Sequence, residues 1–226
     1  MNWKELFEYS PITEVLERIF YFLQFTSLTN LLFKTRGEIQ SNIKEEGEEI
    51  VKTTKKRGRN IELFIIIYCV FVVVLFLIAK STSFKVTFLN DLLLALSIYR
   101  INDVFTYAIN MNIFDNIRMK AEKKLISGVT RTLVLSLLNY FELILYFGII
   151  YSLNIDALKG VKNVFDAFYF SFATQLTMSC SEMYPLNNIA RFVAISQSVI
   201  GFIFGVIIIA RFVSLLPKFE TVQKDG

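Results

Sequence analysis

The residues best suited to chemistry lie together late in the chain, in the stretch FDAFYFSFATQLTMSCSEMYP at residues 165–185. An aromatic half runs from Asp166 to Gln175, and a run of small and polar side chains then leads to Glu182 and Pro185. The stretch is too polar to cross a membrane and too apolar to be a free loop. Irregular backbone at membrane depth is tolerated only where protein buries it or where it lines a water-filled path, so the stretch is interpreted as a re-entrant pore loop.

Other kinds of chemistry find little support in the composition. The sequence has no histidine, which removes the commonest metal ligand and the commonest general base at neutral pH. Its two cysteines, Cys69 and Cys180, form neither a metal motif nor an obvious disulfide framework. The formal net charge of +4 is too small to argue for nucleic acid. We therefore predict no enzymatic activity, no catalytic or metal-binding residues, no organic cofactor and no nucleic-acid partner.

Long apolar runs indicate that the chain is built in a membrane. Of its 226 residues, 54% are hydrophobic, above the roughly 45–50% of soluble domains. The excess is concentrated in runs close to the ~20 residues that a spanning helix needs. We expect an all-α membrane protein with four transmembrane helices, at residues 61–79, 86–114, 132–153 and 189–216.

The second of these spans carries charges that need an explanation. Asp91, Arg100 and Asp103 lie within residues 86–114, and each charge at mid-bilayer could cost about 2.5–3.5 kcal/mol. Arg100 and Asp103 are three residues apart, so on a helix they can pair and offset part of that cost. Voltage sensing would need several regularly spaced arginines, so we favour a static ion pair.

Basic residues set the predicted topology. They cluster at residues 55–59, before the first span, and at residues 118–131, before the third. Both clusters should be cytoplasmic by the positive-inside rule, which requires the chain to cross the membrane twice between them. We therefore expect a multi-pass protein of the cell membrane, in contact with the lipid bilayer, with both termini cytoplasmic.

The first 60 residues form the predicted cytosolic N-terminal segment. A helix is expected at about residues 10–33, because apolar residues recur at helical spacing. They are Ile12, Val15, Leu16, Ile19, Phe20 and Leu23. This amphipathic helix could lie on the membrane surface or pack against cytosolic protein. A charged linker with a basic juxtamembrane run follows, and the segment is a possible site for a cytosolic ligand or protein partner.

Residues 174–185 (TQLTMSCSEMYP) resemble the pattern T-x-x-T-V-G-Y-G-D-x-x-P of the two-helix pore domain of the potassium-channel superfamily. The register fits without gaps, and the resemblance extends over residues 132–217. It implies an outer helix at 132–153, a pore helix at 165–176, a filter at 177–181 and an inner helix at 189–216. It further implies a re-entrant pore loop in each subunit and four identical subunits around a fourfold pore for K+, Na+ or both. Residues 61–131 then form a separate two-helix region with a basic cytosolic loop, and residues 218–226 a cytosolic tail.

The filter departs from the pattern. Ser179 and Ser181 stand in the places of the glycines that aim backbone carbonyls at the ions. A non-glycine residue in the left-handed conformation costs roughly 1–2 kcal/mol. Met178 replaces the valine and Cys180 the bracing tyrosine, so only Thr177 keeps its implied role. Cys180 could be a redox-sensitive or metal-sensitive thiol or inert packing. We expect a wider, weakly selective cation filter; the alternative is a non-conducting membrane sensor or effector that acts through the N-terminal segment.

Glu182 takes the acidic place after the filter, where four copies could concentrate cations at the outer mouth. A structural carboxylate hydrogen-bonded behind the filter is the equal alternative. Tyr169, Thr174 and Gln175 are expected to support the filter from the pore helix.

Two glycines of the inner helix and one carboxylate of the third span are further candidate functional residues. Gly201 and Gly205 are possible bending points of the inner helix. Glu142, near the centre of the third span, could be a gating or permeation group. We favour a structural role in which it is the partner of a pore-helix group such as Gln175 or Tyr169.

Overall fold

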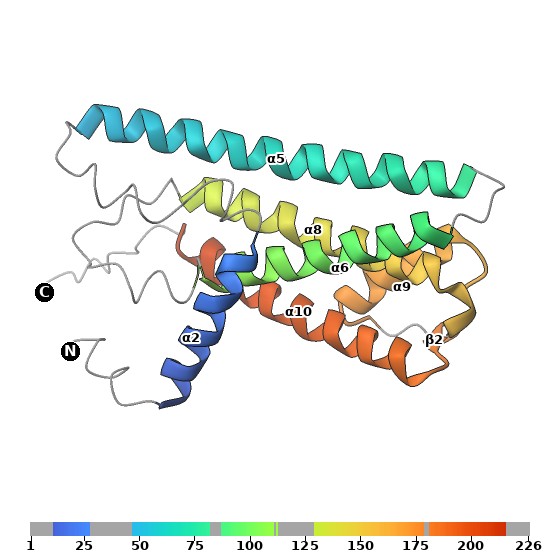
Figure 1. The fold of residues 1–226 in the computed structure, drawn as a ribbon. Coiled ribbons are helices and arrows are strands. Elements are labelled where there is room, and N and C mark those ends of the chain that lie inside the picture. The colour runs from blue at the N-terminus through green and yellow to red at the C-terminus, as the bar shows by residue number, and fades with distance from the viewer. Residues whose placement is uncertain are drawn as a thin grey trace, which may run out of the picture.

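The computed structural model describes residues 11–27, 47–81, 87–110, 112, 129–178 and 181–215. They form a bundle of long helices with one short helix, α9, inserted beside the last of them (Figure 1). The helices and strands in chain order are α2 (Pro11–Thr26), α5 (Gly47–Ser81), α6 (Thr87–Ile109), α8 (Val129–Leu153), η3 (Ile155–Ala157), β1 (Leu158–Lys159), α9 (Val164–Gln175), β2 (Tyr184–Pro185) and α10 (Asn188–Val213). Filter residues Ser179 and Cys180, the tail 218–226 and most of the linker and basic loop lie outside the described residues.

Four of these helices are long and apolar enough to cross a membrane. They are Glu62–Ser81, Thr87–Ile109, Leu133–Leu153 and Asn188–Val213. The prediction of an all-α membrane protein with four spans is confirmed. The short helix α9 occupies the predicted pore-helix position between the last two spans, with its bounds shifted by one residue.

The first span is longer than its apolar run. Helix α5 begins at Gly47, so residues 47–60, which we expected to be part of a linker, are helical. The segment is rich in Glu, Lys and Arg, which are good helix formers, and it contains no proline. Along the apolar part only one stripe is buried, at Ile65, Val72 and Phe76. Tyr68, Cys69, Leu75 and Ala79 are partly buried against the core. On the opposite side Ile66, Ile67 and Phe71 are more than half exposed, as expected of a helix on the lipid-facing edge of a bundle.

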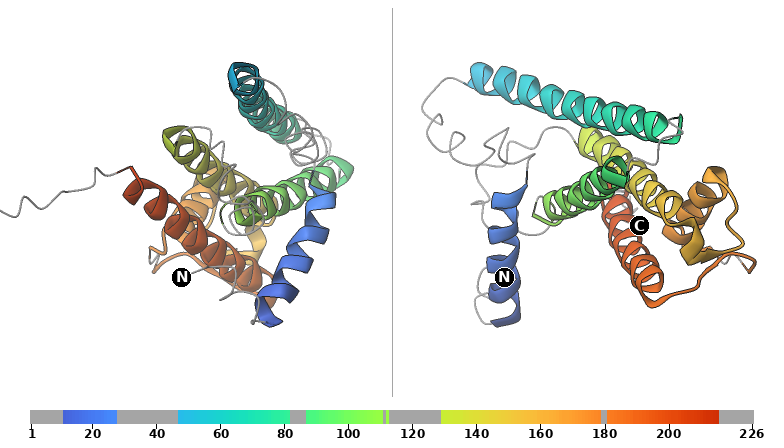
Figure 2. Two further views of the ribbon diagram at one scale, coloured as in Figure 1. Left: turned by 90° about the vertical axis from the view of Figure 1, so that its left-hand side faces the viewer. Right: turned by 45° about the vertical axis from the view of Figure 1, so that its right-hand side comes forward.

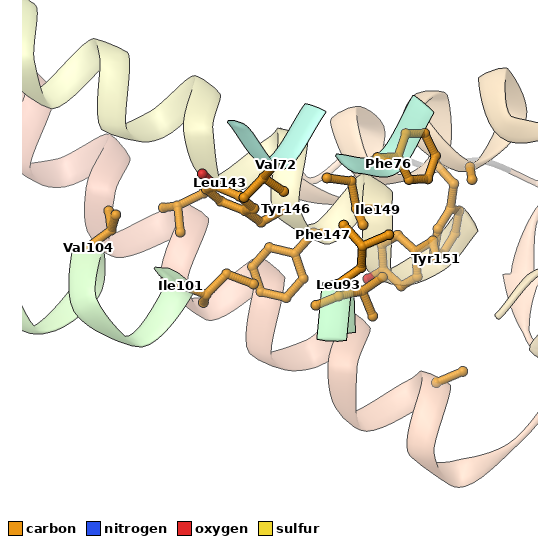
Figure 3. Packing of buried hydrophobic residues seen from close by; sticks show 14 of the residues in the cluster. Val72, Phe76, Leu93, Ile101, Val104, Leu143, Tyr146, Phe147, Ile149 and Tyr151 are labelled. Atoms are coloured by element: carbon orange, nitrogen blue, oxygen red, sulfur yellow. The ribbon is translucent and has the colours of Figure 1, made fainter. Parts of the chain in front are cut away.

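Helix α8 lies at the centre of the bundle, in contact with α5, α6, α9 and α10. Leu143, Tyr146 and Ile149 are fully buried, and Figure 3 shows them among side chains of α5 and α6. Lipid tails are as apolar as these side chains, so close van der Waals packing rather than transfer from water holds such helices together.

The turns around α9 fix its direction. The Asn163 side chain accepts a hydrogen bond from the backbone N–H of Asp166 (2.9 Å), and the Asp166 carboxylate accepts one from the N–H of Lys162 (2.9 Å). These two contacts cap the helix start. Strands β1 and β2 pair antiparallel, Leu158 opposite Pro185, and so join the segment before α9 to the segment after it.

Helix α2 crosses the end of the bundle at which α6 ends, α8 begins and α10 ends (Figures 1 and 2). It contacts α6. The predicted N-terminal helix is therefore present over residues 11–26, while residues 28–33 lie outside the described residues.

Candidate functional site

Helix α9 is held between α8 and α10 by a chain of buried hydrogen bonds. The Ser171 hydroxyl donates to the carbonyl of Ile144 on α8 (2.8 Å). The side-chain amide of Gln197 on α10 donates to the hydroxyl and the carbonyl of Ser171 (both 2.9 Å), and its oxygen accepts from the Tyr151 hydroxyl (2.9 Å). Sequence reasoning missed these residues, although a glutamine in an otherwise apolar span signals an interhelical contact.

The C-terminal end of α9 is tied to both neighbouring spans. The Tyr140 hydroxyl of α8 donates to the carbonyl of Gln175 (3.1 Å). On the other side Gly201 of α10 lies so close that a Cβ built on it would be 2.7 Å from the same carbonyl oxygen. Both side-chain amide atoms of Gln175 are buried and have no hydrogen-bond partner among the described residues. The contacts of Gln175 with α8 and α10 thus run through its backbone carbonyl, at a point where only a glycine fits opposite. Its support of the filter stays a prediction.

The chain reverses direction directly after α9. The N–H of Met178 donates to the carbonyl of Ala173 (2.8 Å), and the N–H of Thr177 to that of Thr174 (3.1 Å). This is the pattern of a Schellman motif, whose turning residue adopts the left-handed conformation and is usually glycine. Here it is Thr177, with φ of 55°, the one non-glycine residue with positive φ in the described part of the chain. A left-handed threonine stores roughly 1–2 kcal/mol.

The filter residues that the structure describes are not buried by the rest of the chain. Thr177, Met178, Ser181 and Glu182 are exposed in the single chain. The Glu182 side chain has no hydrogen bond or ion pair among the described residues, which favours an exposed mouth carboxylate over a structural one behind the filter.

The return from the filter packs on the β1–α9 loop. Gly160 has φ of 79°, and a Cβ there would be 2.2 Å from the carbonyl oxygen of Glu182. The Lys159 ammonium lies 5.1 Å from the centre of the Tyr184 ring, and the interaction with Tyr184 raises the pKa of Lys159. These contacts hold the backbone beneath Glu182.

The other predicted site residues are spread around this core. Tyr169 lies on α9 and is 48% exposed. Thr174 contributes its carbonyl, which also accepts from the Ser198 hydroxyl of α10 (3.5 Å). Gly205 has nothing within 4 Å of the place where its Cβ would lie. A bending role for Gly201 and Gly205 stays a prediction, since α10 is continuous through both.

A second polar centre lies between α6 and α8, away from the filter. The guanidinium of Arg100 donates to both oxygens of Glu142 (2.7 and 3.1 Å) and to Asp103 (2.5 Å). All three residues are at most 3% exposed. Phe64 and Tyr68 of α5 place their rings 5.5 and 5.4 Å from the same guanidinium.

This cluster confirms one prediction and corrects another. The Arg100–Asp103 ion pair is present as expected. Glu142 is a structural partner, but its partner is Arg100 and not Gln175 or Tyr169. A bidentate, charge-assisted pair is stronger than a hydrogen bond to a neutral side chain, and it satisfies two groups that would otherwise be unpaired in the bilayer.

A stripe of apolar residues remains uncovered along α10. Its members recur at alternating steps of three and four residues, and each is more than half exposed: Phe192, Ile195, Val199, Phe202, Val206, Ile209 and Val213. This spacing is typical of a seam between helices. The opposite face, with Gln197, Gly201 and Phe204, is buried against the same chain.

Comparison with known families matches residues 139–218 to a family described as "Ion channel". The match begins within α8 and ends just beyond α10, so it covers the second part of α8, α9, the filter and all of α10. No curated protein and no solved structure matches the chain. Residues 139–218 are therefore similar to an ion-channel family, and the match supports a pore domain of the two-helix potassium-channel type in this part of the chain.

Proposed function

We propose that this chain is one subunit of a tetrameric cation channel whose filter discriminates only weakly between K+ and Na+. The observation that carries the proposal is the re-entrant segment of the pore domain. Helix α9 lies between two spans, and after it the chain reverses direction at Thr177 and continues into an exposed, polar stretch. Irregular backbone at membrane depth is tolerated only where protein buries it or where it lines a water-filled path.

The uncovered stripe on α10 supports assembly of several copies. Its three-and-four spacing suits packing against another helix of the same kind. Around a fourfold axis, part of the stripe would pack against the neighbouring α10 and the rest would line the passage. The exposed apolar residues Phe165 and Phe172 of α9 would contact neighbouring subunits in the same arrangement.

Weak selectivity follows from the filter residues. Ser179 and Ser181 replace two residues that, in the potassium-channel pattern, adopt backbone angles open to glycine. A serine in the left-handed conformation costs roughly 1–2 kcal/mol, and Met178 is exposed in the single chain. A complete cage of carbonyls is therefore not expected, and hydroxyls together with the Glu182 carboxylates would face K+ or Na+.

The orientation is part of the proposal. Basic residues at 55–59 and 118–131 would place the α2 end of the bundle in the cytoplasm, with both termini. The paired strands β1 and β2 and Glu182 would then face outward at the cell membrane. Helix α2 packs on α6 of the same chain, so the N-terminal segment is attached to the transmembrane bundle. This contact does not depend on a cytosolic ligand bound to the segment.

The test is the reversal potential of the purified full chain in planar bilayers, with K+ on one side and Na+ on the other. Current that reverses near zero supports the proposed weakly selective pore. Reversal close to the K+ equilibrium potential would mean that the serines still form a selective cage. No current under voltage, tension or pH change would favour the alternative of a non-conducting sensor.

Two controls make that result interpretable. The Asp156→Asn variant removes an exposed carboxylate from η3, before α9 and outside the filter sequence, and it should conduct like the wild type. Native mass spectrometry should give four times the 26.2 kDa of the chain. A mass of one or two chains would contradict the tetramer irrespective of any current.

A further inference from the structure

Helix α2 has three distinct faces. Phe20 turns toward α6, where its ring lies 6.1 Å from that of Phe105 and its carbonyl accepts from the Asn110 amide (3.1 Å). The exposed Glu14–Arg18 ion pair marks a polar face.

The third face of α2 is apolar and uncovered. Val15, Ile19 and Phe22 are 56%, 48% and 71% exposed, and at 3.6 residues per turn they fall within an arc of about 60°. An amphipathic helix with such an arc beside a charged face is typical of the membrane surface.

The contacts of α2 place it at the depth of the bilayer edge. The Ser27 hydroxyl, directly after the helix, donates to the Asp103 carboxylate. Asp103 lies six residues before the end of a membrane-spanning helix, at Ile109, which is about 9 Å inside that end. The uncovered apolar face is therefore continuous with the lipid-facing surface of the spans, and lipid is the occupant that fits it.

Ser27 is also the first link of a buried chain of polar contacts. Asp103 holds Arg100 at 2.5 Å, and Arg100 holds Glu142 of α8 at 2.7 Å. On either side of Glu142, α8 is bonded to α9: Tyr140 to the carbonyl of Gln175 and Ile144 to the hydroxyl of Ser171. A displacement of α8 at Glu142 therefore acts on the end of the pore helix.

We propose that α2 rests its apolar face in the bilayer surface, and that the buried chain Ser27–Asp103–Arg100–Glu142 transmits its position to the turn that begins the filter. The consequence for ion flow rests on the proposed channel function. The contacts themselves do not, so both parts of the proposal can be tested without measuring current.

The first experiment locates α2 by fluorescence. The sequence contains a single tryptophan, Trp3, so a Trp3→Phe background allows a reporter at Phe22→Trp, with Tyr21→Trp as the neighbouring control. In phosphatidylcholine vesicles with acyl chains brominated near the headgroup, quenching should be about twofold stronger at position 22 than at 21. Equal quenching, or stronger quenching by aqueous iodide at position 22, overturns the membrane contact.

The second experiment follows backbone hydrogen exchange of residues 173–178 in the full chain in nanodiscs. Ser27→Ala removes the first link and should speed exchange there by about threefold. Ser27→Thr keeps the hydroxyl and should restore the slow rate. Ser97→Ala is the matched control, because the buried Ser97 hydroxyl of α6 has no hydrogen-bond partner among the described residues; its rate should stay at the wild-type value.

The outcomes separate this proposal from the channel function. Wild-type exchange in Ser27→Ala, or equal acceleration in Ser97→Ala, overturns the transmission. Faster hydrogen exchange in Ser27→Ala but not in Ser97→Ala supports the transmission even if the protein carries no current. The absence of current would then count only against the proposed channel function.

Discussion

Replacement of Gly201 by alanine tests how closely the pore helix approaches the inner helix. The new Cβ would lie 2.7 Å from the Gln175 carbonyl oxygen and 3.1 Å from two atoms of its side-chain amide. That oxygen belongs to the last residue of α9 and already accepts from Tyr140, so it cannot swing away as a flexible side chain would. Gly205, one turn further along α10, has nothing within 4 Å of its Cβ position and provides the matched variant.

The magnitude follows from two opposing terms. A carbon and a carbonyl oxygen in favourable contact are about 3.3–3.6 Å apart, so α9 and α10 must separate by several tenths of an ångström. Overpacking of this kind costs about 1–3 kcal/mol. Alanine in place of glycine within a helix returns roughly 0.5–1 kcal/mol. We expect Gly201→Ala to lower the free energy of unfolding by about 1–2 kcal/mol per subunit, and Gly205→Ala to raise it by up to about 1 kcal/mol.

The difference between the two variants isolates the steric term, because the helix-propensity gain is common to both. The assay is reversible unfolding in mixed micelles by increasing dodecyl sulfate, followed by far-UV circular dichroism. Equal stability of the two variants would refute the close approach of α9 to Gly201. Gly201 would then be interchangeable with Gly205, as two bending points of one helix should be.

Three further predictions concern the filter and the buried charges. Replacement of Ser179 and Ser181 together by glycine should shift the reversal potential under K+/Na+ gradients toward the K+ value, since glycine permits the carbonyl cage; unchanged selectivity would count against that account. Glu182→Gln should lower inward cation current most at low ionic strength, where an exposed carboxylate is least screened, and current insensitive at every salt concentration would exclude the mouth ring. Glu142→Ala leaves the buried Arg100 with one carboxylate and should destabilise the fold by about 3–5 kcal/mol in the dodecyl sulfate assay, whereas Asp91→Asn, at an exposed position of the same span as Arg100, should change it little; equal effects would mean that the pair is not structural.

Local patterns account for what the sequence predicted correctly. The four spans follow from run length and composition, and the Arg100–Asp103 pair follows from a separation of three residues on one helix. The place of α9 follows from the register of residues 174–185 with a known pattern. Each of these inferences needs only residues that are near one another in the chain.

Other features depend on packing that local patterns do not contain. Gly201 and Gly205 look alike in sequence, and only the position of the Gln175 carbonyl distinguishes them. The charge of residues 47–60 suggested a linker, because charge indicates solvent exposure but does not exclude a helix. The split of α2 into a face toward α6 and a face left uncovered depends on where Phe105 and Asp103 lie.

The partner of Glu142 follows from the geometry of a single helix once two contacts of α8 are known. Tyr140 and Ile144 are one turn apart and both contact α9. Glu142 lies about 160° around the helix from each of them, so it could not face the pore helix that they face. A carboxylate on that opposite side, inside a bilayer, requires a buried cation, and Arg100 is the candidate in a neighbouring span. Polar groups on two opposite faces of α8 thus connect it to α6 on one side and to the pore helix α9 on the other. This identifies α8 as the central helix.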